Sequence, residues 1–173
     1  MCFTETYLAK EHCVNEFLYQ HSYSAFRYDI PDVNNHQGRH GVMICATSCL
    51  NPRKIPIRCQ MSVMEYVVVA IDIAETRLII AVIYRSPSSS MQTFIKEMEE
   101  FLLFLPQNIP TVITGDFNVN LANNSESLLT TLMNGYGFQQ KIKEPTTDSG
   151  SLLDHIYFNR NENDTYTCVH LAI

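Results

Sequence analysis

The segment of residues 110–118, PTVITGDFN, joins a short apolar run to residues that can carry chemistry. Its first five residues are typical of a short buried strand, and Gly115 permits a tight backbone turn where that strand ends. Asp116 and Asn118 follow, and a carboxylate and an amide at this spacing are expected to point into the same cleft. The pair suits phosphate hydrolysis, because Asp116 can orient or deprotonate a water molecule while Asn118 donates to a phosphate oxygen. The alternative is an Asp-Asn turn that only closes the strand.

Two longer apolar runs precede this segment and predict a pair of buried strands. Residues 64–73 (MEYVVVAIDI) and 78–84 (LIIAVIY) are rich in Val, Ile and Tyr, which favour strands. The link between them is short enough for a hairpin. Since both runs are almost continuously apolar, each strand is expected to be buried on both faces.

Two amphipathic helices are predicted around these strands. Residues 91–105 carry apolar side chains at helical spacing, Ser89 and Gln92 form a capping box at the start, and Pro106 stops the helix. A second helix is expected over residues 126–134. Its inward-facing side chains would be Leu128, Leu129, Leu132 and Met133.

The remaining elements are short and complete a single domain over residues 1–173. A helical turn is expected at residues 11–20, and strands are expected at residues 2–8, 23–28, 41–46, 152–158 and 165–171. Strands mixed with helices in this way favour an α+β sandwich, in which sheets lie inside and helices outside.

Polar groups stand at the ends of other predicted strands as well. Glu5 lies in Thr-Glu-Thr after a short strand, where it is either a metal ligand or an ordinary surface residue. Tyr84 and Arg85 begin the sequence Tyr-Arg-Ser-Pro at the end of a buried strand. A phenol and a guanidinium delivered together to one sheet edge can hydrogen-bond a phosphodiester. Alternatively, Tyr84 packs at the edge of the core and Arg85 is solvated.

An aspartate stands inside the apolar segment SLLDHIY, residues 151–157. A carboxylate buried there needs a partner, because an unpaired buried charge is costly, and a histidine held in one tautomer suits it. His155 is adjacent to Asp154 and would point to the opposite face of a strand. The partner of Asp154 must therefore be a different histidine, and His155 is expected to have a structural or edge role.

The charge balance limits the classes of partner. Twelve Lys and Arg against 18 Asp and Glu give a formal charge of −6, and only 17% of residues are charged. This balance excludes a broad basic surface that grips nucleic acid, but it leaves open a local site where a metal ion bridges acidic residues to a phosphate. No apolar run reaches the length of a membrane span and no signal peptide is recognised, so an intracellular location is expected.

Two groups of candidate metal ligands have plainer interpretations. The six cysteines are irregularly spaced, and Cys45, Cys49 and Cys59 are either a zinc cluster or reduced cysteines of an intracellular domain. His36 and His40, in a polar loop, are either a metal pair or two solvated side chains. The reduced cysteines and the solvated histidines are the favoured interpretations.

The order of the motifs resembles the endonuclease/exonuclease/phosphatase superfamily. Thr-Glu-Thr, Tyr-Arg-Ser-Pro, Gly-Asp-Phe-Asn and Leu-Asp-His-Ile-Tyr follow one another over nearly the whole chain. The chain most resembles the apurinic-endonuclease-like domains of non-LTR retrotransposons and Helitron-type transposons. This resemblance implies a DNase-I-like, four-layer α/β/β/α sandwich, a Mg²⁺-dependent phosphodiesterase site at the sheet edge (with Mn²⁺ as a substitute) and DNA as the partner. Glu5 would ligate the metal. A single protein ligand is compatible with Mg²⁺, because this ion usually binds only one or two carboxylates and keeps several waters.

The resemblance also implies a role for each remaining residue of the site. Tyr84 would contact the scissile phosphate, and Arg85 would lie next to the nucleic-acid backbone. Asp116 would activate the attacking water, and Asn118 would bind a phosphate oxygen. Asp154 would orient a catalytic histidine.

The chain departs from the superfamily pattern at both ends. The superfamily begins with a strand that carries an Asn, but here only four residues precede Glu5. The superfamily ends with Ser-Asp-His, whereas this chain offers only His170, without the preceding Ser-Asp. Tyr7 and Ser86 replace a Trp and a Pro that are common there. We therefore expect an incomplete sandwich that lacks its first and last strands, with weak or no activity, because one lost donor can cost on the order of 10²–10³ in rate.

Three functions remain open from the sequence alone. The first is a DNA-nicking endonuclease of a mobile element, which would act in the nucleus. The second is a phosphatase or phosphoesterase of the same superfamily that acts on small or lipid phosphates. The third is a non-catalytic remnant. The oligomeric state is open in all three cases.

Overall fold

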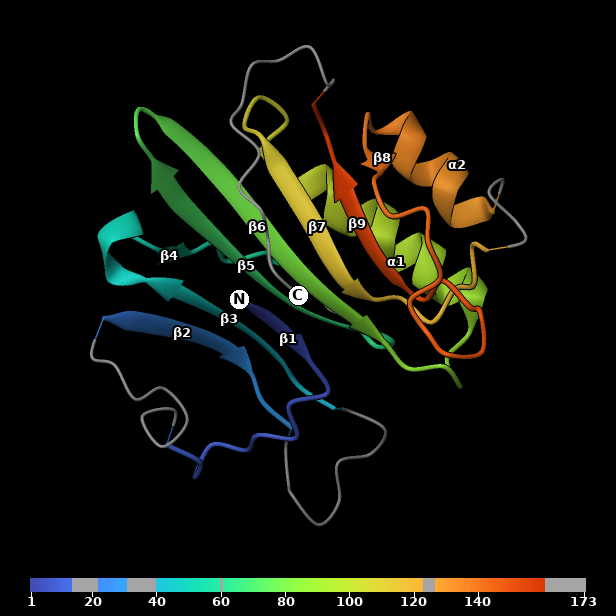
Figure 1. The fold of residues 1–173 in the computed structure, drawn as a ribbon, viewed down its shortest axis with the longest axis horizontal. Coiled ribbons are helices and arrows are strands. Elements are labelled where there is room, and N and C mark those ends of the chain that lie inside the picture. The colour runs from blue at the N-terminus through green and yellow to red at the C-terminus, as the bar shows by residue number, and fades with distance from the viewer. Residues whose placement is uncertain (14–21, 31–39, 60, 123–126, 161–173) are drawn as a thin grey trace.

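A computed structural model describes residues 1–13, 22–30, 40–59, 61–122 and 127–160 of the chain. Two β-sheets pack face to face, and two helices cover the outer face of the larger sheet (Figure 1). The predicted α+β sandwich is confirmed. The described residues form three layers, which are the two sheets and the helices on one outer face. The predicted helical turn at residues 11–20 lies mostly outside the described residues. Neither helix is long and apolar enough to cross a membrane within the described part of the chain.

Among the described residues, the smaller sheet has three antiparallel strands in the order β1-β3-β2. The strands are β1 (Cys2–Thr4), β2 (Tyr23–Tyr28) and β3 (Val42–Thr47), and β3 leads into the short helix η2 (Ser48–Leu50). The strands predicted at residues 23–28 and 41–46 are therefore confirmed to within one residue. The strand predicted at residues 2–8 is shorter, and it ends where Glu5 takes a left-handed backbone conformation with φ of 53°.

In the part of the chain that the structure describes, the larger sheet has six strands in the order β4-β5-β6-β7-β9-β8. These are β4 (Arg53–Lys54), β5 (Met64–Ile73), β6 (Thr76–Arg85), β7 (Thr111–Asp116), β8 (Gln139–Gln140) and β9 (Asp154–Phe158). Among the described strands, only β6 and β7 pair in parallel, and the helix α1 (Met91–Phe104) connects them. The strand predicted at residues 165–171 lies outside the described residues.

The central strands β5 and β6 are buried on both faces, as their continuous apolar sequences predict. One face of the hairpin, with Val68 and Ile83, packs against α1 and the helix α2 (Leu128–Gly135). The other face, with Val67 and Val82, packs against Val42 and its neighbours in the smaller sheet. Because side chains alternate along a strand, the hairpin contributes to two separate cores.

Helix α1 begins one residue later than the predicted capping box. Ser90 is the N-cap, and its hydroxyl accepts a hydrogen bond from the backbone N–H of Thr93 at 3.3 Å. The hydroxyl of Ser89 instead donates to the carbonyl of Ser86 at 2.7 Å and closes the preceding turn. The prediction that Ser89 caps the helix is therefore wrong, because the local turn already uses its side chain.

Helix α2 buries a narrower face than the sequence predicts. Leu129 and Met133 are fully buried, but Leu128 is 67% exposed. Ser127 is the N-cap, so Leu128 is the first helical residue and lies about 100° around the axis from Leu129. Leu132 is partly buried and packs against the same core, so Leu128 is the one predicted inward-facing side chain of the four that lies outside the buried face.

Strand β7 continues through Gly115 and ends at Asp116, one residue beyond the predicted turn. Gly115 has φ of 137°, and a Cβ atom there would collide with the backbone carbonyl of Ile83 on β6. The glycine therefore permits close approach of two strands. The tight turn falls at Asn118, whose φ is 49°.

Candidate catalytic site

Three polar side chains stand in one row across adjacent strands of the larger sheet. Tyr84 on β6 is in register with Asp116 on β7, and Asp116 is in register with Asp154 at the start of β9. Residues in register point to the same face of a sheet, and Tyr84 faces the smaller sheet. Figure 1 shows the arrowheads of β6 and β7 and the beginning of β9 at the same end of the sheet. The sequence motifs that carry these residues thus meet at one edge.

Glu5 reaches this row from the smaller sheet. The hydroxyl of Tyr84 donates a hydrogen bond to Oε1 of Glu5 at 3.0 Å. Glu5 follows directly after β1 and is the residue that departs from the strand conformation, which turns its carboxylate toward β6. The structure therefore brings Glu5 and Tyr84 together as the sequence predicts, although the two residues are 79 positions apart.

His40 is a third member of this contact, and the sequence interpretation placed it in a solvated loop. Its Nδ1 lies 2.8 Å from the hydroxyl oxygen of Tyr84 and 3.0 Å from Oε1 of Glu5. Its ring stacks on Tyr84, with centroids 4.9 Å apart, and on Tyr7, with centroids 5.2 Å apart. His36 lies outside the described residues, so the predicted alternative of a histidine metal pair is not tested.

Glu65 holds His40 in place and was also missed at the sequence level. Its side chain is buried, and its carboxylate accepts the backbone N–H of His40 at 3.0 Å and that of Gly41 at 2.7 Å. Glu65 stands directly opposite Tyr84 in the β5–β6 pair. An acidic residue near the start of the apolar run MEYVVVAIDI is the feature that could have revealed it, because a buried carboxylate requires donors.

Asn118 clamps the carboxylate of Asp116. The backbone N–H of Asn118 donates to Oδ1 of Asp116 at 2.9 Å, and its side-chain amide donates to Oδ2 at 3.0 Å. The same amide also donates to the carbonyl of Arg85 at 2.8 Å. Both amide hydrogens of Asn118 are thereby engaged, so the residue positions Asp116 in this conformation.

Burial raises the pKa of Asp116 above its ordinary value. The hydrogen bonds from Asn118 oppose this shift, whereas the neighbouring carboxylates Asp154 and Glu5 reinforce it. A carboxylate whose pKa is raised by burial and by like charges is typical of a catalytic base.

Arg85 does not line the site, contrary to the sequence expectation. Its side chain is 4% exposed, and its guanidinium donates to the carbonyls of Asn118 at 3.0 Å and Ser89 at 2.5 Å. It also lies over the ring of Phe94 on α1, 5.5 Å from the centroid. Tyr84 and Arg85 are consecutive on a strand and therefore point to opposite faces. The predicted contact of Arg85 with a nucleic-acid backbone is replaced by a structural contact with the loop that holds Asn118.

Asp154 is exposed, so the premise that it is a buried carboxylate is wrong. As the first residue of β9, it lies at the open edge beside Asp116. No histidine contacts its side chain among the residues that the structure describes, and His170 lies outside them.

His155 points to the face opposite Asp154, as predicted. Its ring is fully buried and stacks on Phe117, with centroids 4.7 Å apart. Its Nε2 lies 2.9 Å from the carbonyl oxygen of Val119, and burial lowers its pKa to about 4. A neutral, enclosed imidazole of this kind has a structural role.

The side chains at this edge fit Mg²⁺ better than they fit a metal that is coordinated mainly by protein ligands. No group of three or more His, Cys, Asp or Glu side chains is arranged to hold an ion within the described ranges. The side chain of Glu5 is 46% exposed, and Asp116 and Asp154 add negative charge nearby. Mg²⁺ is usually bound through one or two carboxylates and retains several waters, so Glu5 is a suitable ligand. The zinc interpretation of Cys45, Cys49 and Cys59 has no such cluster to support it.

No protein-family model matches this chain, and no curated protein matches its sequence. Solved structures match its fold. The endonuclease domain of TRAS1, a telomere-specific non-LTR retrotransposon, is 13% identical with a TM-score of 0.62, and the match covers 80% of this chain and 65% of that one. The catalytic domain of human Nocturnin with bound sulfate is 13% identical with a TM-score of 0.60, covering 92% and 68%.

A third structure carries the name of the superfamily. It is an endonuclease/exonuclease/phosphatase family protein from Bacteroides thetaiotaomicron, 13% identical with a TM-score of 0.51, and the match covers 83% of this chain and 62% of that one. The chain thus spans less than two thirds of the length of the TRAS1 domain and of the Bacteroides protein. These similarities show that the chain shares the DNase-I-like fold of these proteins.

Proposed function

We propose that the chain is a Mg²⁺-dependent phosphodiesterase domain and that it nicks DNA. The observation that carries this proposal is the row formed by Tyr84, Asp116 and Asp154, with Glu5 facing it from the other sheet. The row brings a phenol and several carboxylates to one open edge, which is the chemistry that a phosphodiester hydrolase requires. The fold of the retrotransposon endonuclease domain supports DNA as the substrate.

Asp116 is the base in this proposal. The raised pKa makes its carboxylate a better proton acceptor for an attacking water than an ordinary aspartate, and Asn118 fixes its orientation. Tyr84 can donate its hydroxyl hydrogen to a phosphate oxygen once that oxygen displaces the carboxylate of Glu5. Glu5 would hold the Mg²⁺, which supplies charge stabilisation at the phosphate. Mn²⁺, which takes the same oxygen ligands, is expected to replace it.

Asp154 contributes negative charge beside Asp116. Because Asp154 is exposed, its carboxylate can contact a group of the substrate, a solvent molecule or another part of the polypeptide. We propose that it orients such a group.

A second candidate is a phosphatase or phosphoesterase that acts on small substrates. The formal charge of −6 favours it, because an acidic chain repels the DNA backbone outside the metal site. Human Nocturnin, whose catalytic domain was solved with a sulfate anion, has the same fold.

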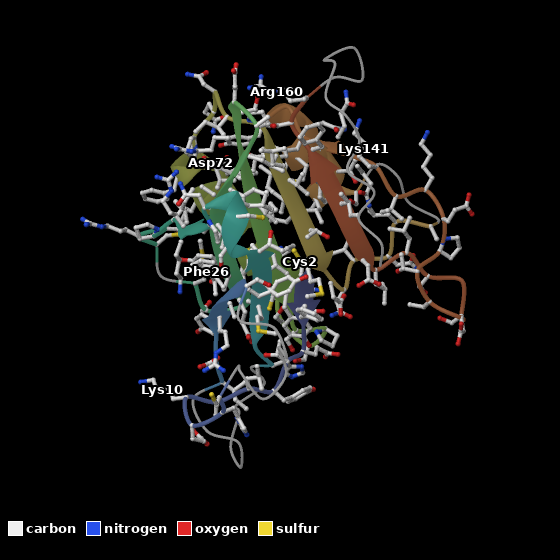
Figure 2. The ribbon with its side chains drawn as sticks, turned by 60° about the vertical axis from the view of Figure 1, so that its left-hand side comes forward. Cys2, Lys10, Phe26, Asp72, Lys141 and Arg160 are labelled. Carbon is white, nitrogen blue, oxygen red and sulfur yellow. The ribbon has the colours of Figure 1, made fainter. Side chains whose placement is uncertain are left out.

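Nicking of supercoiled plasmid in Mg²⁺ tests the proposal, with the same assay in EDTA as the metal-free comparison. Asp116→Asn should slow nicking on the order of 10²–10⁴-fold, whereas the control Asp72→Asn should retain the wild-type rate. Asp72 lies at the far end of the β5–β6 hairpin, paired with Arg53 and Arg77 (Figure 2). Hydrolysis of a phosphomonoester without nicking would favour the second candidate. Inactivity on both substrates would contradict a catalytic role for the chain.

A further inference from the structure

Three aromatic rings form a continuous stack that leads from the site to the surface. Tyr84 is buried on β6, His40 stacks on it at an interplanar angle of 27°, and Tyr7 stacks on His40 at 30°. Tyr7 is the outermost of the three and is 45% exposed. The stack therefore presents an exposed aromatic side chain beside the Glu5–Tyr84 contact.

The backbone of Tyr7 is held in an unfavourable conformation. Its φ is 52°, in the left-handed region that a bulky side chain rarely adopts. Burial does not explain this conformation, because nearly half of the side chain remains in solvent. Strained residues of this kind cluster where a site needs a side chain in a fixed place.

The segment that carries Tyr7 is fixed against the loop that carries His40. The backbone N–H of Tyr7 donates to the carbonyl of His40 at 2.7 Å, and that of Thr6 donates to the carbonyl of Gly41 at 3.2 Å. Gly41 has φ of 82°, and a Cβ there would lie 2.5 Å from the hydroxyl of Thr6, so glycine favours this approach. The carboxylate of Glu65 in turn holds the backbone of His40 and Gly41. Tyr7 is thus pre-organised, which lowers the entropy lost when a ligand binds to it.

We propose that Tyr7 is a stacking platform for a nucleobase whose phosphate lies at the Glu5–Asp116 site. This inference rests on the proposed function and names its substrate class as a phosphate ester that carries a planar base, either in an unpaired stretch of a polynucleotide or in a mononucleotide. Aromatic rings bind bases of any sequence through their faces. An acidic chain of formal charge −6 can also gain affinity by stacking, because stacking requires no basic surface.

Equilibrium binding in Mg²⁺ tests the proposal, with every protein carrying Asp116→Asn so that turnover is slow. The probes are a short abasic oligonucleotide that carries one 2-aminopurine as its only base, the same oligonucleotide without that base, and 2-aminopurine riboside monophosphate. Fluorescence of 2-aminopurine should be quenched on binding. Tyr7→Ala should weaken binding of the probes that carry the base on the order of 5- to 150-fold. It should leave binding of the probe without a base unchanged, and Tyr7→Phe should keep the affinity and quenching of the protein with Tyr7.

Phe104→Ala is the matched control, because Phe104 is an aromatic residue of similar exposure, 52%, on helix α1. The two base-bearing probes distinguish a polynucleotide from a mononucleotide as the source of the base. If plasmid nicking by the wild type persists, equal affinity and quenching for Asp116→Asn with and without Tyr7→Ala would overturn the stacking role and leave the proposed function intact. Failure of the Asp116→Asn protein to bind any probe would overturn it as well, and failure of the wild type to nick in addition would overturn the proposed function.

Discussion

The hydroxyl of Tyr84 on β6 donates to the carboxylate of Glu5, the residue that follows β1 on the opposite sheet, at 3.0 Å. This contact joins the two sheets of the sandwich at the edge where Asp116 and Asp154 also stand. Both the phenol and the carboxylate lie beside His40. A contact that bridges the sheets makes the geometry of the site depend on how the sheets pack.

Removal of the Tyr84 hydroxyl should separate activity from stability. In Tyr84→Phe the ring remains in the core between the sheets, so only the hydrogen bonds to Glu5 and His40 are lost. We expect the free energy of unfolding to fall by about 1 kcal/mol. The nicking rate should fall on the order of 10²-fold, since a donor positioned at the phosphate is lost. Urea unfolding and plasmid nicking measure the two effects, and an unchanged rate would contradict the assigned role of Tyr84.

The raised pKa of Asp116 predicts an acid limb in the pH–rate profile. The base must be deprotonated, so the nicking rate should rise with pH through a pKa above the ordinary aspartate value of about 3.9. A limb at or below that value would argue that Asp116 is not the base.

The same shift predicts how stability depends on pH. The folded-state pKa of Asp116 lies above its unfolded value, so its contribution is complete below the unfolded pKa and is lost as the pH rises through the folded pKa. The free energy of unfolding of wild type minus that of Asp116→Asn should therefore decrease with rising pH across this window. Urea melts at a series of pH values measure this difference, and an increase would contradict the sign of the shift.

Glu65 should be important for stability. Glu65→Ala leaves the N–H groups of His40 and Gly41 without their acceptor, and we expect a loss of about 3 kcal/mol in the free energy of unfolding. Glu65→Gln keeps one acceptor oxygen and should recover part of this loss. The control Glu75→Ala removes an exposed carboxylate in the turn between β5 and β6 and should change stability by less than about 0.5 kcal/mol. Equal effects of Glu65→Ala and Glu75→Ala would contradict the clamp.

Gly115 and Gly150 give a matched test of close strand packing. Both glycines have a positive φ, but a Cβ on Gly115 collides with the carbonyl of Ile83, whereas a Cβ on Gly150 meets nothing within 4 Å. Gly115→Ala should cost about 3 kcal/mol or more, and Gly150→Ala about 1 kcal/mol. Thermal or chemical unfolding measures the difference, and a Gly150→Ala variant as unstable as Gly115→Ala would argue against the close approach of β6 and β7.

The sequence was sufficient to predict the residues whose position depends on a strand. Tyr84 and Asp116 each end a buried apolar run, and parallel pairing of β6 and β7 brings the two ends together. The opposite orientation of Asp154 and His155 was also predictable from strand alternation. The same alternation applied to Tyr84 and Arg85 would have placed Arg85 against α1, where the structure has it.

Other residues depend on contacts that no local pattern encodes. His40 stands in a loop, and its position follows from the buried carboxylate of Glu65, 25 residues later, and from the backbone of Tyr7. Asp154 occurs in an apolar segment, but its exposure reflects its place at the end of β9. Leu128 fits a helical stripe, yet the length and start of α2 decide which leucines are buried.

A double-mutant cycle on plasmid nicking tests most directly whether the two sheets build one catalytic site. The variants are Glu5→Gln, Asp116→Asn and the combination of both, measured in Mg²⁺. Groups that act as a unit in catalysis are strongly non-additive, so the account predicts that the double variant is about as slow as the slower single variant. A double variant slowed by the product of the two single effects would contradict the account, because Glu5 and Asp116 would then act independently.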